Sequence, residues 1–394
     1  MSRILNIARR ECRRLLKNPM YVLCMLVFPL AVTFLFTSLM DEGQPENMPV
    51  GVVDQDNTTF TRKLTHSLDA FQTTRIVARY ASFDEARLAM QHGDIYAFLY
   101  FPEGTTDALL SSRRPTISFY YTYTSLTAGA LLFRDLKTIS TLGSAAVGQA
   151  TLRAKGLTPE QIATFLQPIK VDLHTVSNPW VNYNVYLSTM LVPGCLLLFV
   201  FLVTAYSLGQ ELKMQTSKEL LKMAGGNVFA ALGGKMLPHL VINLAVFFFY
   251  LFYVYTFGHF PHGGGVGDIL LLGFLSVVAS MGFAVFMFGL LPSLRMSMSL
   301  CSLWGVLSFS MVGTAFPTFA MDAPLEVLAQ LFPLRHYFRL YQTCVFNGNA
   351  LVYDWPNILA LVAFALLRML VSMLVTVLGL VNKLPVIGTV NRWL

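Results

Sequence analysis

The sequence has little charge and little cysteine. Only 12% of its 394 residues are charged, whereas 55% are hydrophobic. A soluble chain could not cover that much apolar surface with so few charges, so the composition predicts an integral membrane protein. Its five cysteines include none between 41 and 180 and form no CxxC spacing. This excludes a disulfide framework and a cysteine metal site.

A nucleotide-binding loop is also missing. The pair Gly234-Lys235 would fit the end of such a loop, but Phe229 stands where the loop needs glycine and Met236 where it needs Ser or Thr. We therefore expect no cofactor in this chain, and any ATP and Mg²⁺ to be bound by a partner ATPase. No Ser/His/Asp or Cys/His arrangement supports catalysis, so we expect no enzymatic activity in this chain.

Six apolar runs are long enough to cross a bilayer: 20–40, 184–207, 236–257, 268–291, 297–318 and 357–380. The four from 184 to 318 hold no acidic residue except Asp268 at a boundary. That absence argues against a proton-coupled carrier, which needs a titratable relay.

The placement of positive charge predicts the topology. Six Arg and Lys residues precede the first run, four lysines lie in the loop 208–235, and Lys383 and Arg392 follow the last run. The loop 258–267 has none. By the positive-inside bias, both termini are expected to be cytoplasmic. The net charge of +7 thus sits beside membrane segments, which argues against a nucleic-acid partner.

The domain organisation follows from this pattern. Residues 1–19 are expected to form an amphipathic interfacial helix, 20–40 the first transmembrane helix, 41–180 an extracytoplasmic α/β domain, and 181–394 five further transmembrane helices. The first helix would place apolar residues on one face and basic residues on the other: Ile4, Leu5, Ala8, Cys12, Leu15 and Leu16 against Arg3, Arg9, Arg10, Arg13, Arg14 and Lys17.

The segment 41–180 reads as alternating strands and helices. Strands are predicted at 48–56, 75–80, 95–101 and 116–123, and helices at 58–71, 83–91, 125–155 and 159–166. With 12 basic and 14 acidic residues it has no polybasic patch. A long domain of this kind crosses the membrane largely regardless of its own charge.

Two features of the second half allow alternatives. The segment 319–356 is broken by prolines and fits either re-entrant half-helices or a hairpin lying on the outer surface. Arg368 lies near the middle of the last run, where a charge costs about 2.5–3.5 kcal/mol or more. It is a candidate for the translocation path, with carbonyl-bonded structural glue as the other interpretation.

The cytoplasmic loop predicts an amphipathic helix at about 211–223, ended by Gly225-Gly226. From the residues alone it fits a solvated loop helix or a partner-docking helix. Its order of residues is Gln210-Glu211, Thr216, Glu219-Leu220-Leu221 and Gly234-Lys235. That order resembles the E-x-GT-x-E-x-LL…GK pattern of ABC exporter permeases, with Gln215 in place of the glycine. The stretch 313–338 is similar to the outer segment of the same family.

The resemblance covers essentially the whole chain and implies a function. Glu211, Thr216, Lys218 and Glu219 would lie at the interface with a separately encoded ATPase, and 1–19 would be the elbow helix. The permease would pair with a second copy or a sibling permease in the bacterial inner membrane. A periplasmic adaptor and an outer-membrane channel would complete an efflux pathway for an amphipathic or hydrophobic molecule or lipid. The alternative is a membrane-anchored receptor or sensor whose outer domain binds a ligand.

Overall fold

The computed structural model describes residues 2–39, 41–111, 113–168, 178, 182–314 and 316–377. The chain divides into two compact units, Glu42–His174 and a larger one that joins Met1–Asp41 to Thr175–Leu394. Parts of the predictions lie outside the described residues: the end of the 41–180 domain, the last three residues of the run 357–380, and Lys383 and Arg392. Each unit is described by itself below.

The unit Glu42–His174 contains a four-stranded sheet in the order β2-β1-β3-β4. Its strands are β1 (Met48–Asp54), β2 (Thr74–Tyr80), β3 (Ala97–Phe101) and β4 (Ser118–Tyr121). β1 runs parallel to both neighbours, and β4 pairs antiparallel with β3. Each strand falls within or next to a predicted one, because runs rich in Val, Ile, Phe and Tyr favour the pleated backbone.

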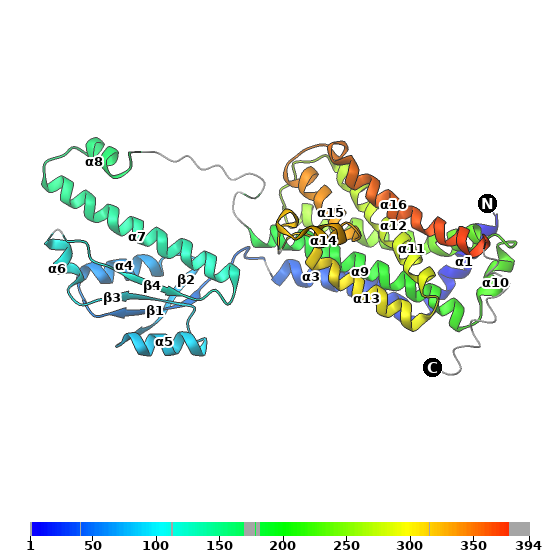
Figure 1. Ribbon diagram of the computed structural model, residues 1–394, viewed down its shortest axis with the longest axis horizontal. Helices are drawn as coiled ribbons and strands as arrows, with labels where there is room; N and C mark the ends of the chain where they lie inside the picture. The colour runs from blue at the N-terminus through cyan, green and yellow to red at the C-terminus, as the bar shows by residue number, and fades with distance from the viewer. Residues whose placement is uncertain are drawn as a thin grey trace. The chain divides into compact units, whose positions relative to one another are not determined.

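Helices cover both faces of this sheet (Figure 1). α4 (Thr59–Asp69) and α7 (Leu126–Ala154) pack on one face through Leu68, Leu132 and Leu136. α5 (Phe83–His92) packs on the other face and ends at Gly93, which takes the left-handed conformation. α6 (Thr105–Leu110) and α8 (Pro159–Leu166) complete the unit.

Within the larger unit, five helical segments of the described chain are long and apolar enough to cross a membrane. They are Pro19–Leu39, Tyr183–Lys213, Val228–Thr256, Val266–Leu290 and Leu351–Leu370. The first combines α2 (Pro19–Val22), a π-helical turn (Leu23–Val27) and α3 (Phe28–Leu39); the next three are α9, α11 and α12; the last includes most of α16 (Trp355–Val377). The multi-pass membrane assignment made from composition therefore holds.

The predicted run 297–318 differs from these five. Its helix, α13, spans Leu294–Met311 and is not among them. It ends seven residues earlier than predicted, because Gly313 takes a φ of 99° and Pro317 follows. Both residues are incompatible with continuing an α-helix.

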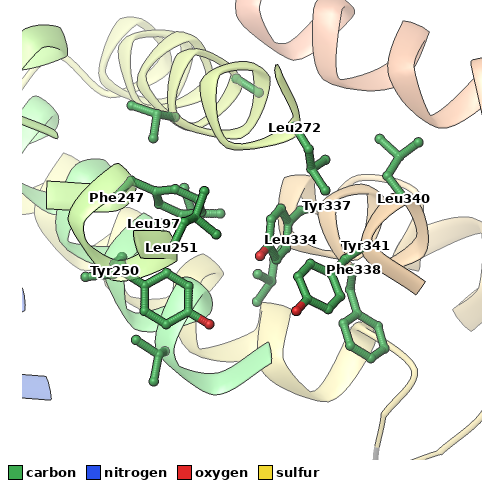
Figure 2. Packing of buried hydrophobic residues seen from close by; sticks show 14 of the residues in the cluster. Leu197, Phe247, Tyr250, Leu251, Leu272, Leu334, Tyr337, Phe338, Leu340 and Tyr341 are labelled. Atoms are coloured by element: carbon green, nitrogen blue, oxygen red, sulfur yellow. The ribbon is translucent and has the colours of Figure 1, made fainter. Parts of the chain in front are cut away.

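The core of this unit lies between α9, α11, α12 and α15 (Pro333–Tyr341). Figure 2 shows Phe247, Tyr250 and Leu251 of α11 facing Leu334, Tyr337 and Tyr341 of α15. Every residue of α15 except Arg339 is buried. This helix is thus packed inside the protein.

The rest of the segment predicted at 319–356 is a series of short pieces. They are a 3₁₀ turn at Thr318–Ala320, α14 (Ala323–Ala329), a π-helical turn at Gln342–Phe346 and a 3₁₀ turn at Leu351–Asp354. Two of the prolines predicted to divide the segment, Pro324 and Pro333, lie in the first turns of α14 and α15. A proline's missing N–H costs nothing there.

Two helix predictions near the N-terminus and the loop need correction. The helix predicted over 211–223 is two elements: α9 continues to Lys213, and α10 spans Ser217–Met223. Gln215 separates them with a φ of 55°, a conformation that a non-glycine residue rarely adopts. In α1 (Ser2–Lys17) the predicted apolar face is divided: Ala8 and Leu15 are buried together with Ile7 and Glu11, while Leu5, Cys12 and Leu16 are exposed.

Candidate functional site

Three helices meet where α9 ends and α11 begins. α1 packs lengthwise along the first turns of α11, and Gly234 makes that approach possible. A Cβ added at Gly234 would lie 2.9 Å from the Cβ of Ile7 and 3.0 Å from the carbonyl oxygen of Ile4. Only glycine fits so close to another backbone. The next residue, Lys235, is thereby directed into the contact between α1, α9 and α11.

Lys235 is the centre of a buried group of charges. Its side chain is 0% exposed, and its Nζ lies 2.8 Å from Glu11 Oε1 and 3.0 Å from Glu211 Oε1. Glu11 comes from α1 and Glu211 from the last turn of α9. One ammonium group therefore joins two carboxylates from helices that are far apart in the sequence.

Two arginines of α1 complete the group on its more exposed side. Arg10 Nη1 donates to Glu211 Oε1 at 3.0 Å, and Arg14 Nη1 also donates to that oxygen. We refer to Arg10, Glu11, Arg14, Glu211 and Lys235 as the charge cluster. Its three cations and two anions are nearly balanced, which is the condition under which charges can be buried.

Ser207 and His239 extend this contact by one helical turn. The Ser207 hydroxyl donates to Glu11 Oε1 at 3.1 Å, and His239 Nε2 lies 3.1 Å from the same oxygen. Ser207 Oγ and His239 Nε2 are themselves 3.2 Å apart. Glu11 Oε1 is thus contacted from both α9 and α11.

The environment of Glu11 fixes its ionisation. Burial by itself would raise the pKa of this carboxyl, because it disfavours the charged form. The hydrogen bond from His239 and the positive charge of Lys235 outweigh burial and lower the pKa from 4.5 to about 2. Glu11 is therefore a carboxylate at neutral pH and a permanent partner of Lys235.

The cluster is linked to α10 through the turn after α9. Thr216, which precedes α10, donates its hydroxyl hydrogen to Glu211 Oε2. Leu220 of α10 and Ala224, the residue just after it, pack against Ile7 of α1 and Ala231 of α11. α10 is therefore fixed on its apolar face, and its opposite face is left exposed at Lys218, Glu219 and Lys222.

The predicted ATPase-contacting residues divide into two groups. Glu211 is buried with a side chain only 4% exposed, and Thr216 is half-buried and bonded to it. Lys218 and Glu219 are exposed, and Glu219 reaches the charge cluster only through Arg10 at 3.9 Å. The structure brings Glu211, Thr216 and Glu219 together and leaves Lys218 apart from them.

Sequence reasoning missed Glu11, Lys235 and His239 as members of one site. A signal was present: Glu11 is the only acidic residue of the basic helix 2–17, and Ser207/Glu211 and Lys235/His239 both have the four-residue spacing that places side chains on one helix face. A single carboxylate among six basic residues of one helix is most simply explained by a partner on another helix of the protein.

Two other features carry less chemistry. Arg368 is half-buried in α16 and takes part in an interaction.

A small cavity of about 30 Å³ lies between α9, α12, α13 and α15, and its lining includes Phe201, Phe283, Trp304 and Leu334. That volume holds about one water molecule. Among the described residues, no group of three or more His, Cys, Asp or Glu side chains is placed to hold a metal ion.

Comparison with known proteins gives one family. The model of the family described as "ABC-2 family transporter protein" matches residues 20–374. The match therefore includes α9, α10 and α11 and begins just after α1. A comparison with curated proteins found no match.

Proposed function

Because this chain belongs to the ABC-2 family of transporter proteins and is a membrane permease component, we propose that it is the permease subunit of an ATP-driven exporter. Family membership implies a partner ATPase subunit. We propose that this ATPase is encoded separately and that it binds the ATP and Mg²⁺. The cargo we propose is an amphipathic or hydrophobic small molecule or a lipid.

The observation that carries this proposal is the anchoring of α10. Its polar face is exposed at Lys218, Glu219 and Lys222, while Leu220 and Ala224 hold its other face against α1 and α11. A partner that pushes on the exposed face would act on α1, α9 and α11 together. Met214 and Phe229, which are also exposed, supply apolar contacts beside the charged ones.

This assigns different roles to the four residues expected at the ATPase interface. Lys218 and Glu219 contact the ATPase directly. Glu211 and Thr216 act inside the permease, since the Glu211 carboxylate is already shared by Arg10, Arg14, Lys235 and Thr216. Closure of two ATPase subunits on ATP would press on α10, and the charge cluster would transmit the movement to α9 and α11.

The proposed membrane arrangement counts α13 as the fifth of six spans, with α16 as the sixth. Both termini are cytoplasmic, the unit Glu42–His174 is outside the cytoplasm, and the membrane is the bacterial inner membrane. This assignment rests on the four lysines of the loop 208–235 and the absence of Lys and Arg from 258–267. A second copy or a sibling permease, and a periplasmic adaptor with an outer-membrane channel, complete the proposed assembly.

Arg368 is proposed to border the translocation path. It lies in the middle of α16, a helix with no acidic residue between Trp355 and Val377. A charge at such a depth by default faces a cavity or a protein partner. Substitution of Arg368 by Lys, which keeps the charge, and by Met, which removes it, separates a role of the charge in transport from one in packing.

The alternative of a ligand receptor is not favoured by the unit Glu42–His174. Sheets of this type bind ligands at the carboxyl ends of neighbouring parallel strands. At that edge the Asp56 carboxylate accepts a hydrogen bond from the Thr106 backbone N–H at 3.1 Å, and the Thr58 and Thr106 hydroxyls are 2.7 Å apart. The segment after β1, which holds Asp56 and Thr58, is thus bonded directly to Thr106 of α6, which follows β3.

Co-purification with the ATPase encoded nearest to this chain tests the proposal, followed by substrate-stimulated ATP hydrolysis in lipid discs. The variants Lys218→Glu and Glu219→Arg should weaken ATPase association while the permease stays folded. Matched controls in the other unit are Lys155→Glu and Glu160→Arg, two exposed positions. If the α10 variants bind the ATPase as well as the controls do, α10 is not the contact and the proposed coupling route is wrong.

A further inference from the structure

α9 and α11 run past each other with a regular pairing of polar residues. Glu211 faces Lys235 at 3.0 Å, and one turn further Ser207 faces His239 at 3.2 Å. Thr204 lies three residues before Ser207, and Asn243 lies four residues after His239. These spacings keep Thr204 and Asn243 on the same helix faces as Ser207 and His239. We call these six residues the polar seam.

The end of the polar seam away from Glu211 and Lys235 is inside the protein. Thr204 is 0% exposed, His239 is 0% exposed and Asn243 is 6% exposed. About one turn further along the seam, the next residues are Val200 of α9 and Val246 of α11. Both are buried and apolar. The seam therefore ends in a closed apolar region rather than at a surface.

Several polar atoms at this place have no partner within the protein. Among the described residues, seven buried side-chain nitrogen and oxygen atoms lack a hydrogen bond, and four of them belong to the seam and to Glu11. They are Glu11 Oε2, Thr204 Oγ1, His239 Nδ1 and Asn243 Nδ2. An atom left unpaired in a dry interior loses its hydrogen bonds to water and gains none in return, so four such atoms require an explanation.

We propose that the polar seam is an internal hydration site, in which ordered water bonds to Glu11, Thr204, His239 and Asn243. The chemical types of the four atoms fit water. Glu11 Oε2 accepts, and His239 Nδ1 accepts when Nε2 donates to Glu11. Thr204 can donate, and the Asn243 Nδ2 group donates. Water has two hydrogens for the acceptors and two lone pairs for the donors.

A cation fits the same atoms less well, because positive charges of the protein lie close by and would repel it. Lys235, Arg10 and Arg14 already supply positive charge next to this place. An anion is opposed by Glu11 Oε2. Buried water typically makes about three hydrogen bonds to otherwise unsatisfied groups, which is what these atoms offer.

This inference goes beyond the proposed exporter function and does not depend on it. Hydroxyl-radical footprinting of the full-length chain in lipid discs tests it, because radicals formed from bound water modify buried neighbours. Labelling of His239, normalised to the reactivity of the free amino acid, should exceed that of Phe247 severalfold. Phe247 is the matched control, since it is 1% exposed on the same helix and has no polar atom. Equal labelling of the two residues overturns the proposal.

The variant Thr204→Val gives a second, opposite-signed test. If Thr204 bonds to water, the isosteric valine loses that bond and lowers Tm by about 2–4 °C. If the site is dry, the variant removes an unpaired hydroxyl, so Tm stays constant or rises, which overturns the proposal. Thr189→Val is the matched control on α9, because the Thr189 hydroxyl is buried and bonded to the Val185 carbonyl at 2.8 Å. Neither measurement requires an ATPase or a substrate.

Discussion

Lys235 Nζ and Glu11 Oε1 are 2.8 Å apart, although 224 positions separate the two residues in the chain. Both side chains are completely buried. This contact fixes the N-terminal helix α1 to the first turns of α11. Because Glu211 shares Lys235, the end of α9 is fixed at the same point. Thr216, at the start of α10, bonds to the same Glu211 carboxylate, so α10 is attached to the point where these three helices meet.

The losses from removing the two partners of this contact should not be additive. Lys235→Met leaves Glu11 and Glu211 buried with one cation fewer, so we expect a loss of roughly 3–5 kcal/mol in the free energy of unfolding. The double variant Glu11→Gln/Lys235→Met also removes the Glu11 carboxylate, whose cationic partner was Lys235. Its loss should fall short of the sum of the single losses by about 0.5–3 kcal/mol. Unfolding of the four proteins in lipid discs measures this, and strict additivity would contradict direct coupling.

The ionisation of Glu11 should appear in the acid stability of the permease. Its pKa is lowered from 4.5 in the ordinary state to about 2 in the folded protein. A lowered folded pKa stabilises the fold at pH values above 4.5, and this contribution is lost as the pH falls through 2. Melting curves between pH 6 and 2 should therefore show a smaller decline for Glu11→Gln, which starts less stable, than for the wild type. Glu160→Gln, at an exposed position, should follow the wild-type curve.

Regular elements could be predicted from the sequence where local chemistry decides them. β1, α4, α5 and α8 lie close to their predicted bounds because Thr58, Ser82 and Thr158 cap helices and Gly93 ends one. The break at Gln215 could not be predicted, since glutamine has no preference for the left-handed conformation that it adopts.

The partners that meet in the charge cluster could not be predicted, for a different reason. The residues of α1 have two apolar stripes, one through Ile7 and Leu15 and one through Leu5, Cys12 and Leu16. Periodicity alone cannot tell which stripe faces protein and which faces lipid. Glu11 lies within the stripe that the structure buries, and only the position of Lys235 on a distant helix explains why.

The close approach of α1 and α11 predicts a sharp difference between two adjacent glycines. Gly234→Ala would place its Cβ 2.9 Å from the Ile7 Cβ and 3.0 Å from the Ile4 carbonyl oxygen, atoms that cannot retreat without moving α1. We expect a loss of about 1–3 kcal/mol and weaker retention of Lys235 in its contacts. Gly233→Ala is the control, because nothing lies within 4 Å of its added Cβ. That change should be neutral or stabilise α11 by up to about 1 kcal/mol. Equal effects at the two positions would show that α1 does not pack here.

The exposed stripe of α1 predicts how this helix meets the bilayer. Leu16 is 80% exposed and Leu5 58% exposed, and Cys12 lies between them on the same side of the helix. Arg9 and Arg13 lie along the edge of this stripe and are also exposed. Such an arrangement buries the apolar stripe in the membrane interface and leaves the arginines at the headgroups. In a variant with Cys12 as its single cysteine, a nitroxide at Cys12 should be relaxed more by oxygen than by a water-soluble nickel complex. A nitroxide introduced by Arg13→Cys in a Cys12→Ser background should show the reverse ratio. If both labels respond alike, α1 lies in water or within protein and its role as an interfacial helix is wrong.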